Sequence, residues 1–161
     1  FMALMLFSSM VKAQDDKFKA LFMYNFTKYL EWPHESQTRE FVIQVFGSSP
    51  IIDELEVIAS KKMVAGRPIR VMRINSPQEI ENSHIVFITE SRSNRISEIV
   101  SAVGSKPVVI IAEKPGLSKQ GAGINYVKVD GKISFEVNKA NIEKKGINVN
   151  TQLLALGIEV N

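Results

Sequence analysis

The order of strand-like and helix-like segments is the feature of this sequence that most constrains its fold. Strongly apolar strand patterns occur at 41–46, 68–74, 84–88 and 107–112. Each of the first three is followed by a segment with helix signals, such as the capping box at 76–79 or Gly104 after a helix-like run from about Ser91. Strands that alternate with helices over short connections form parallel sheets, because a parallel pair needs a crossover. The order predicts an α/β fold whose largely parallel sheet carries helices on both faces.

The alternation of strands and helices ends near residue 123. Two alternating runs, 124–129 and 132–137, are separated by Asp130–Gly131, a strong signal for a two-residue hairpin turn. The predicted sheet is therefore mixed, and it ends in an antiparallel hairpin. Since no repeat, low-complexity tract or interior linker is present, the sequence predicts a single domain.

Helices are expected before and after the sheet. From Gln14, apolar residues recur at helical spacing until Trp32–Pro33, where the proline should end the helix. That apolar stripe comprises Phe18, Leu21, Phe22, Phe26, Tyr29 and Leu30. Asn25 falls on the stripe, and we expect its amide to bond to backbone or to a neighbouring polar group.

The last part of the chain predicts short helices with asparagine caps. Asn138 can cap a helix that ends at Gly146. Asn150 can cap a final helix that carries Leu153, Leu154 and Ile158 on its apolar face.

The first residues, FMALMLFSSMVKAQDD, resemble the end of a secretory signal peptide. An apolar run gives way to polar and small residues, and cleavage is expected after Ala13. The alternative is an ordinary N-terminal core helix. The apolar run is too short to span a bilayer, so direct membrane insertion is not expected. We therefore expect residues 1–13 to be a signal remnant and residues 14–161 to form one exported, soluble domain.

Composition and charge fit a globular chain. Of the 161 residues, 45% are hydrophobic and 23% charged, and the net charge is +3. Basic residues are scattered, with only the pairs Lys61–Lys62 and Lys144–Lys145, which we expect on a solvated surface. A nucleic-acid binder gathers its basic residues on one face, so no nucleic-acid partner is predicted.

No catalytic or metal-binding signature is apparent. His34 and His84 are the only histidines, neither has a partner at ligand spacing, and there is no cysteine, so no metal site is predicted. A hydroxyl at Ser49 follows a strand, but Ser49 is better interpreted as a helix cap than as a nucleophile. We predict no cofactor and no enzymatic activity.

One local pattern suggests a ligand. Gly47, Ser48 and Ser49 connect a strand to a helix, and in open α/β sheets ligands bind at the carboxyl ends of the strands. An anionic or aromatic molecule could bind there. Gly121 and Gly123 precede a strand instead, so they do not form a phosphate-binding loop. Glu136 lies within a strand, where it faces solvent or pairs with a base.

Several motifs together resemble the YfiR-like family of periplasmic proteins, in order and over nearly the whole chain after residue 14. These motifs are Phe22–Phe26, Tyr29–Pro33, Gly66–Ile69, Gly121–Asn125, Lys132–Asn138 and Asn150–Leu154. The resemblance implies a sheet flanked by helices, a periplasmic location and no catalytic residues. The family-motif residues that we expect to be structural are Asn25, Trp32, Pro33, Arg67, Gly121, Gly123, Phe135, Glu136 and Asn138.

The resemblance also implies a function. The family's named member binds the periplasmic sensor domain of an inner-membrane diguanylate cyclase, which lowers cyclic di-GMP and restrains biofilm formation. It carries disulfides and responds to redox conditions, whereas this chain has Ser83 where relatives often have cysteine. The redox response therefore does not transfer. The partner could also be another receptor, such as a sensor kinase, and a homodimer is consistent with the family.

We therefore expect an exported regulatory protein that inhibits a membrane-bound signalling enzyme by binding its periplasmic domain. Met23 and Tyr24 lie off the main apolar stripe of the first helix and are candidates for partner contacts, the alternative being burial under a second layer. The alternative function is a periplasmic small-ligand sensor that uses the crevice at residues 47–49.

Overall fold

The computed structural model describes residues 2–36 and 38–161, so Phe1 of the expected signal remnant lies outside the described residues. The helices are α1 (Met2–Phe26), α2 (Ile51–Ala59), α3 (Ile96–Val103), α4 (Lys139–Glu143) and α5 (Thr151–Leu156). The strands are β1 (Leu30–Glu31), β2 (Phe41–Phe46), β3 (Met63–Val64), β4 (Arg67–Ile74), β5 (Ile85–Ile88), β6 (Val109–Ala112), β7 (Ile124–Val129), β8 (Lys132–Asn138), β9 (Asn148–Val149) and β10 (Ile158–Val160).

The main sheet has the order β10-β8-β7-β6-β5-β2-β4-β3. Its central strands β4, β2, β5, β6 and β7 run parallel, while β8 pairs antiparallel with β7. Numbered along the chain, the parallel strands have the order 2-1-3-4-5, which is that of flavodoxin-like sheets. The chain changes direction across the sheet between β2 and β5, and this switch point opens a crevice at the carboxyl ends of the strands.

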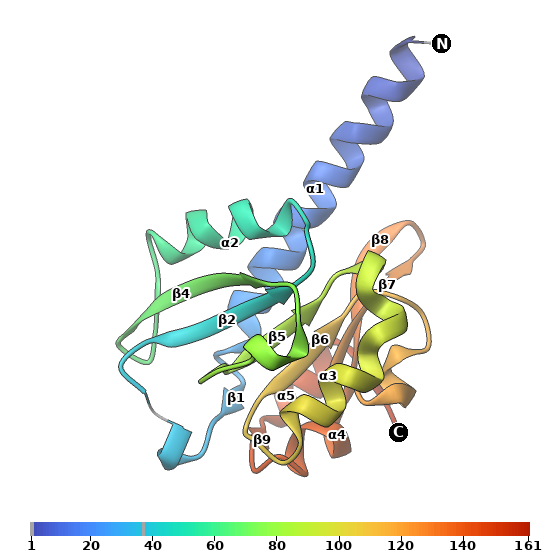
Figure 1. Cartoon of the computed structure of the whole chain (residues 1–161). Helices are drawn as coiled ribbons and strands as arrows, with labels where there is room; N and C mark the ends of the chain where they lie inside the picture. Colours follow the sequence, from blue (N-terminus) through green and yellow to red (C-terminus); the bar gives the residue numbers. More distant parts are fainter. Residues whose placement is uncertain (1, 37) are drawn as a thin grey trace.

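Helices cover both faces of this sheet, as predicted (Figure 1). Alternate residues of the central strands belong to two separate cores. On β5, Ile85 and Phe87 face the core shared with α1, α2 and α5, while Val86 and Ile88 face the core under α3. Strands buried on both faces explain the nearly continuous apolar runs of the sequence. The predicted fold class is confirmed.

The predicted hairpin is present, with one addition at its edge. Asp130 (φ 51°) and Gly131 (φ 75°) form the turn between β7 and β8. Ile158, which the sequence analysis placed on the last helix, lies instead in β10, parallel to β8. The helix ends at Leu156 because Gly157 is extended, and a side chain at Gly157 would clash with the ring of Phe135.

The first helix differs most from expectation. It begins at Met2 and continues without a break through the expected cleavage site, projecting beyond the rest of the chain (Figure 1). It ends at Phe26 and not at Trp32, because the Thr27 hydroxyl bonds to the Tyr24 carbonyl and the next residues turn away. Leu30 then pairs with Val149 in the small β1–β9 sheet. Among the described residues, no helix is long and apolar enough to cross a membrane.

Candidate functional site

A crevice lies at the switch point, where the sequence analysis placed a candidate ligand site. Its volume is about 970 Å³, and α1 runs along one side of it. The lining residues come from the ends of β2, β5 and β6, from β7 and from α1. They include Ser48, Ser49, Thr89, Glu90, Ser91, Glu113, Lys114, Lys128, Lys12, Asp15, Asp16 and Lys19. Tertiary structure therefore gathers hydroxyls and charges that are far apart in sequence.

The turn after β2 shapes one wall of the crevice. Gly47 has a φ of 108°, and an added Cβ would lie 2.3 Å from Thr89 Oγ1, so only glycine fits. Ser49 Oγ accepts a hydrogen bond from the Ile51 amide, which is the cap role expected for Ser49. Ser48 is exposed beside it. Of these residues, Ser48 has the hydroxyl most accessible to a ligand.

An ion pair forms the floor of the crevice. Lys19 Nζ on α1 lies 2.9 Å from Glu113 Oε2, and the other oxygen of Glu113 accepts the Glu90 amide at 2.8 Å. The Tyr126 hydroxyl donates to the Lys19 carbonyl. Because these bonds join α1 to the ends of β5 and β6 and to β7, they hold the helix across the strand ends.

Asp16 is a buried acid beside this pair, with 6% of its surface exposed. Burial raises the pKa of Asp16 above its ordinary value, an effect that Glu113 increases and Lys19 opposes. Nearby, Asp15 pairs with Lys128 of the hairpin at 2.9 Å. The crevice therefore presents both signs of charge. That arrangement can hold a polar molecule, but it provides no histidine to activate a nucleophile.

The two residues proposed for partner contact have different positions. Met23 is fully buried at 0% exposure, in the core between α1 and the sheet. For Met23 the structure shows burial, which the sequence analysis left open as the alternative to partner contact, because the helix turns this side chain toward the sheet. Tyr24 is half-buried against the same core, and Lys28 lies 5.0 Å from its ring centroid.

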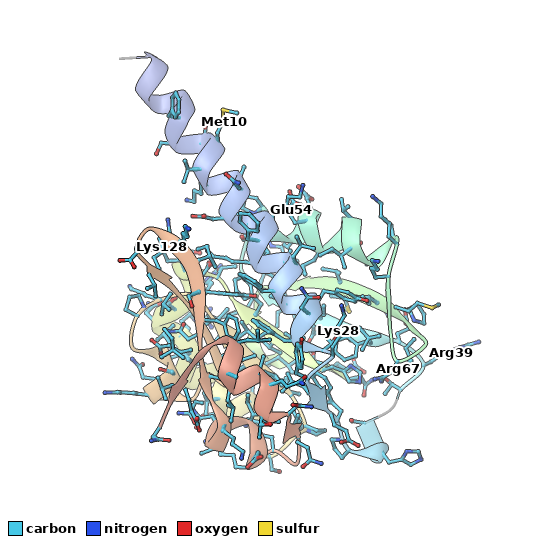
Figure 2. The ribbon with its side chains drawn as sticks, turned by 180° about the vertical axis from the view of Figure 1, so that it is seen from behind. Met10, Lys28, Arg39, Glu54, Arg67 and Lys128 are labelled. Carbon is cyan, nitrogen blue, oxygen red and sulfur yellow. The ribbon has the colours of Figure 1, made fainter. Side chains whose placement is uncertain are left out.

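The exposed apolar surface of α1 is on the opposite face. Phe18 and Leu21, which the sequence analysis assigned to the apolar stripe, are 45% and 41% exposed. Nearer the N-terminus of α1, Phe7, Met10 and Val11 are exposed as well, and Figure 2 labels Met10 on the projecting part of the helix. The sequence did not reveal this exposed surface, because α1 has apolar residues on both sides. Helical spacing alone does not show which side packs against the sheet.

The family-motif residues Trp32 and Arg67 lie in one cluster around Phe41 and His84. Trp32 is buried edge-on against Phe41 and lies edge-on to His84, while Phe41 stacks on the His84 ring. Arg67 covers the Phe41 ring at 5.4 Å. The Pro33 carbonyl accepts bonds from Ser36, which fixes the loop over this cluster.

His84 is neutral in this cluster. The Val42 amide donates to Nδ1, so Nε2 carries the proton and donates to the Ser36 carbonyl at 2.8 Å. Burial lowers the pKa of His84, and the Arg67 guanidinium lowers it further against the hydrogen bond to Ser36. The histidine therefore joins β2 to the loop after β1.

The remaining motif residues also support the fold. The Ser118 hydroxyl donates to Glu136 at 2.5 Å, and the Ser118 carbonyl accepts from the amide of Asn138. A side chain on Gly123 would meet Ile142 at 2.6 Å, which explains the glycine before β7. These contacts bind the hairpin to α4 and to the turn before Gly121. Two further motif side chains are Asn25, which accepts from Lys28, and Phe135, which packs on Phe26.

Comparisons with known proteins agree with this architecture. No curated protein matches the chain. A solved structure that matches is described as the ABC domain in complex with L-Trp from Streptococcus pneumonia, with a TM-score of 0.57 and 14% identity. The match covers 76% of this chain and 55% of that one, so the chain spans about half the length of that protein. At this identity the likeness concerns the fold alone.

A family model described as YfiR/HmsC-like (DUF4154) matches residues 16–158, which is most of the chain. The match confirms the resemblance that the motifs indicated. The chain belongs to the YfiR/HmsC-like family.

Proposed function

We propose that this protein is an exported regulator that inhibits a membrane-bound signalling enzyme by binding its periplasmic domain. The enzyme is a diguanylate cyclase or a sensor kinase of the inner membrane. The YfiR/HmsC-like family consists of periplasmic regulators of diguanylate cyclases and is regulatory rather than catalytic. Periplasmic export after cleavage at Ala13, a homodimer and the identity of the partner are parts of this proposal.

The observation that supports a binding role most directly is the exposed apolar face of α1. Contiguous apolar surface is costly in water and marks interaction sites. Phe18 and Leu21 lie one turn apart on this face, and both remain in the chain if residues 1–13 are removed. We place the partner contact there, in place of Met23.

Inhibition would follow from a shift in population. A regulator that binds the inactive conformation of its receptor more tightly than the active one stabilises the inactive state. A near-complete switch needs a preference of about 10⁴-fold. No chemistry by the regulator is required.

The test is a pull-down of tagged residues 14–161 from detergent-solubilised membranes of the host, read by mass spectrometry. We expect one inner-membrane cyclase or kinase to be enriched over an unrelated exported control. Addition of the regulator to that purified enzyme should lower its product formation.

Two variants test the surface. Phe18→Ser with Leu21→Ser should abolish the enrichment, whereas Leu156→Ser, at an exposed apolar residue on α5, should leave it unchanged. If no membrane protein is enriched even after mild crosslinking, the regulator proposal fails. If the double variant still enriches the same enzyme, the contact lies elsewhere on the protein.

A second function is favoured by the crevice at the switch point. Its mixed charges and its hydroxyls fit a small molecule that carries both an anionic and a cationic group, such as an amino acid. The related fold in complex with L-Trp supports testing this class. If the signal remnant is cleaved, the crevice loses Phe7, Val11 and Lys12 but keeps Ser48 and Lys19.

Thermal shift of residues 14–161 with individual amino acids tests the second function. We expect a saturable rise in Tm with one of them, reduced in Ser48→Val. Ser48 is exposed, so its replacement should not weaken the fold itself. An absence of any saturable shift would remove this function and leave the regulator proposal standing.

A further inference from the structure

A second cavity lies at the opposite ends of the strands from the crevice. Its volume is about 660 Å³, and it opens where β5 and β6 begin. The walls are the loop after β1, the loops that lead into β5 and β6, and the segment after α4. The lining includes Glu81, His84, Ser105, Lys106, Lys144 and Lys145. It shares no residue with the crevice.

Lys145 is the unusual residue of this cavity. From the sequence we expected Lys144 and Lys145 together on a solvated surface. Lys144 is exposed, but Lys145 is buried, with 6% of its surface exposed. The expectation was wrong for Lys145 because the turn that ends α4 at Gly146 directs its side chain inward, toward the Gly104 carbonyl. Burial of a cation is costly unless it is paired.

The pairing of Lys145 is incomplete among the described residues. Its Nζ donates to the Gly104 carbonyl at 2.6 Å, and an ammonium has three N–H donors. The ion pairs found in residues 2–36 and 38–161 do not include Lys145. Burial lowers the pKa of Lys145, and the neighbouring Lys144 lowers it further, as expected for a cation without an anionic partner.

The surroundings add more positive charge than negative. Lys106 and Lys144 line the rim of the cavity, and Glu81 is the acidic residue of the lining. His84 is neutral, as its hydrogen bonds require. The hydroxyl of Ser105 adds a hydrogen-bond donor beside Lys106. Pro107 and the other apolar residues of the lining can contact the non-polar part of a small organic molecule.

We propose that this cavity binds a small organic anion, whose carboxylate or phosphate group accepts hydrogen bonds from Lys145 at the base and from Lys106 and Lys144 at the rim. The volume admits a molecule of metabolite size and excludes a protein segment with its own fold. The bound carboxylate or phosphate would supply the anionic partner that the Lys145 ammonium lacks. This site is independent of the regulator contact on α1 and of the crevice.

Nuclear magnetic resonance of the full chain tests the site with two probes, inorganic phosphate and benzoate, at constant ionic strength. We expect saturable shifts of the amides of 104–106 and 144–146 with at least one probe, and the preferred probe identifies the head group. Lys145→Met should weaken that binding at least tenfold. Lys62→Met, which removes an exposed lysine outside the cavity, should not change it.

Two results would overturn the proposal. The first is that neither probe gives saturable shifts at these amides. The second is that Lys145→Met binds the probe as tightly as the unchanged chain does. The shifts would then come from general attraction of the anion by surface lysines. Should Lys145→Met fail to fold, Lys106→Ala provides the same test, because Lys106 is exposed and its loss should weaken binding several-fold.

Discussion

Lys19 and Glu113, 94 residues apart in sequence, form a mostly buried ion pair of 2.9 Å at the floor of the crevice. Their side chains are 15% and 9% exposed. Since Glu113 also accepts the Glu90 amide, the pair connects α1 with the ends of two parallel strands. The position of α1 over the strand ends depends on this contact.

Replacing Lys19 by methionine should therefore destabilise the fold. The change leaves the Glu113 carboxylate buried with one remaining hydrogen bond, which should cost about 2 to 3 kcal/mol in the free energy of unfolding. Urea denaturation measures it. Lys128→Met is the matched control, because the pair of Lys128 with Asp15 is more exposed and should contribute less than about 0.5 kcal/mol. Equal effects for the two variants would contradict the role given to Lys19.

Gly47→Ala should be far more damaging than a glycine change at the hairpin. At Gly47 an added Cβ would meet Thr89 Oγ1 at 2.3 Å, in addition to the strain of a φ of 108°. The loss should exceed about 2 kcal/mol. At Gly131 nothing lies within 4 Å of an added Cβ, so Gly131→Ala should cost only the strain of about 1 kcal/mol. Thermal unfolding of both variants compares them, and a similar fall in Tm would show that contact with Thr89 is unimportant.

The neutral state of His84 predicts how stability depends on pH. The pKa of His84 is lower in the fold than its ordinary value of 6.5, so the unfolded chain takes up a proton more readily than the folded one as the pH falls through that value. Stability contributed by neutral His84 is thus present above pH 6.5 and is lost as the pH falls toward the lowered pKa. The slope is at most about 1.4 kcal/mol per pH unit for one proton.

His84→Asn tests this dependence by denaturation between pH 7 and pH 5. Asparagine can still accept the Val42 amide but does not titrate, so the variant should be less stable at pH 7 and should lose less stability on acidification. His34→Asn, the same substitution at an exposed histidine, is the matched control. An unchanged slope in His84→Asn would contradict the assignment.

Asp16 predicts the opposite dependence at lower pH. Because burial raises its pKa, the folded chain holds a proton on Asp16 more readily than the unfolded chain, and the fold loses stability as the pH rises from 3.8 through the raised pKa. Asp16→Asn removes this penalty. The variant should have a higher Tm than the unchanged chain at pH 7, and the gain should shrink as the pH approaches 3.8. Asp15→Asn, which removes the pair with Lys128, should give no gain at pH 7. A lower Tm of Asp16→Asn at pH 7 would show that the charged form is stabilised.

The sequence predicted those parts of the fold that depend on local signals. The apolar runs of β2, β5 and β6 required burial on both faces, and the Asp130–Gly131 turn adopts the positive φ values that its residues favour. Asn138 and Asn150 cap helices as expected, because a cap bond joins residues two or three apart. Some of the family-motif side chains, such as Trp32, Phe135 and Asn138, are buried in the fold.

The candidate sites depended on contacts that sequence cannot rank. The glycine and serines after β2 were found because they follow a strand, but the charges opposite them come from α1 and from the ends of β5 and β6. Burial of Met23 and exposure of Phe18 depend on which side of α1 packs against the sheet. Lys145 looked like its neighbour Lys144 until the turn after α4 directed it inward.

The sequence by itself determined the alternation of strands and helices, the hairpin and the asparagine caps of the last two helices, since each depends on residues within a few positions of one another. Only the tertiary structure decided the strand order, the buried face of α1, the charge pairs of the crevice and the buried lysine of the second cavity. Those features depend on packing between segments tens of residues apart. Their free energies arise from burial and from electrostatic contacts that exist only once the segments meet.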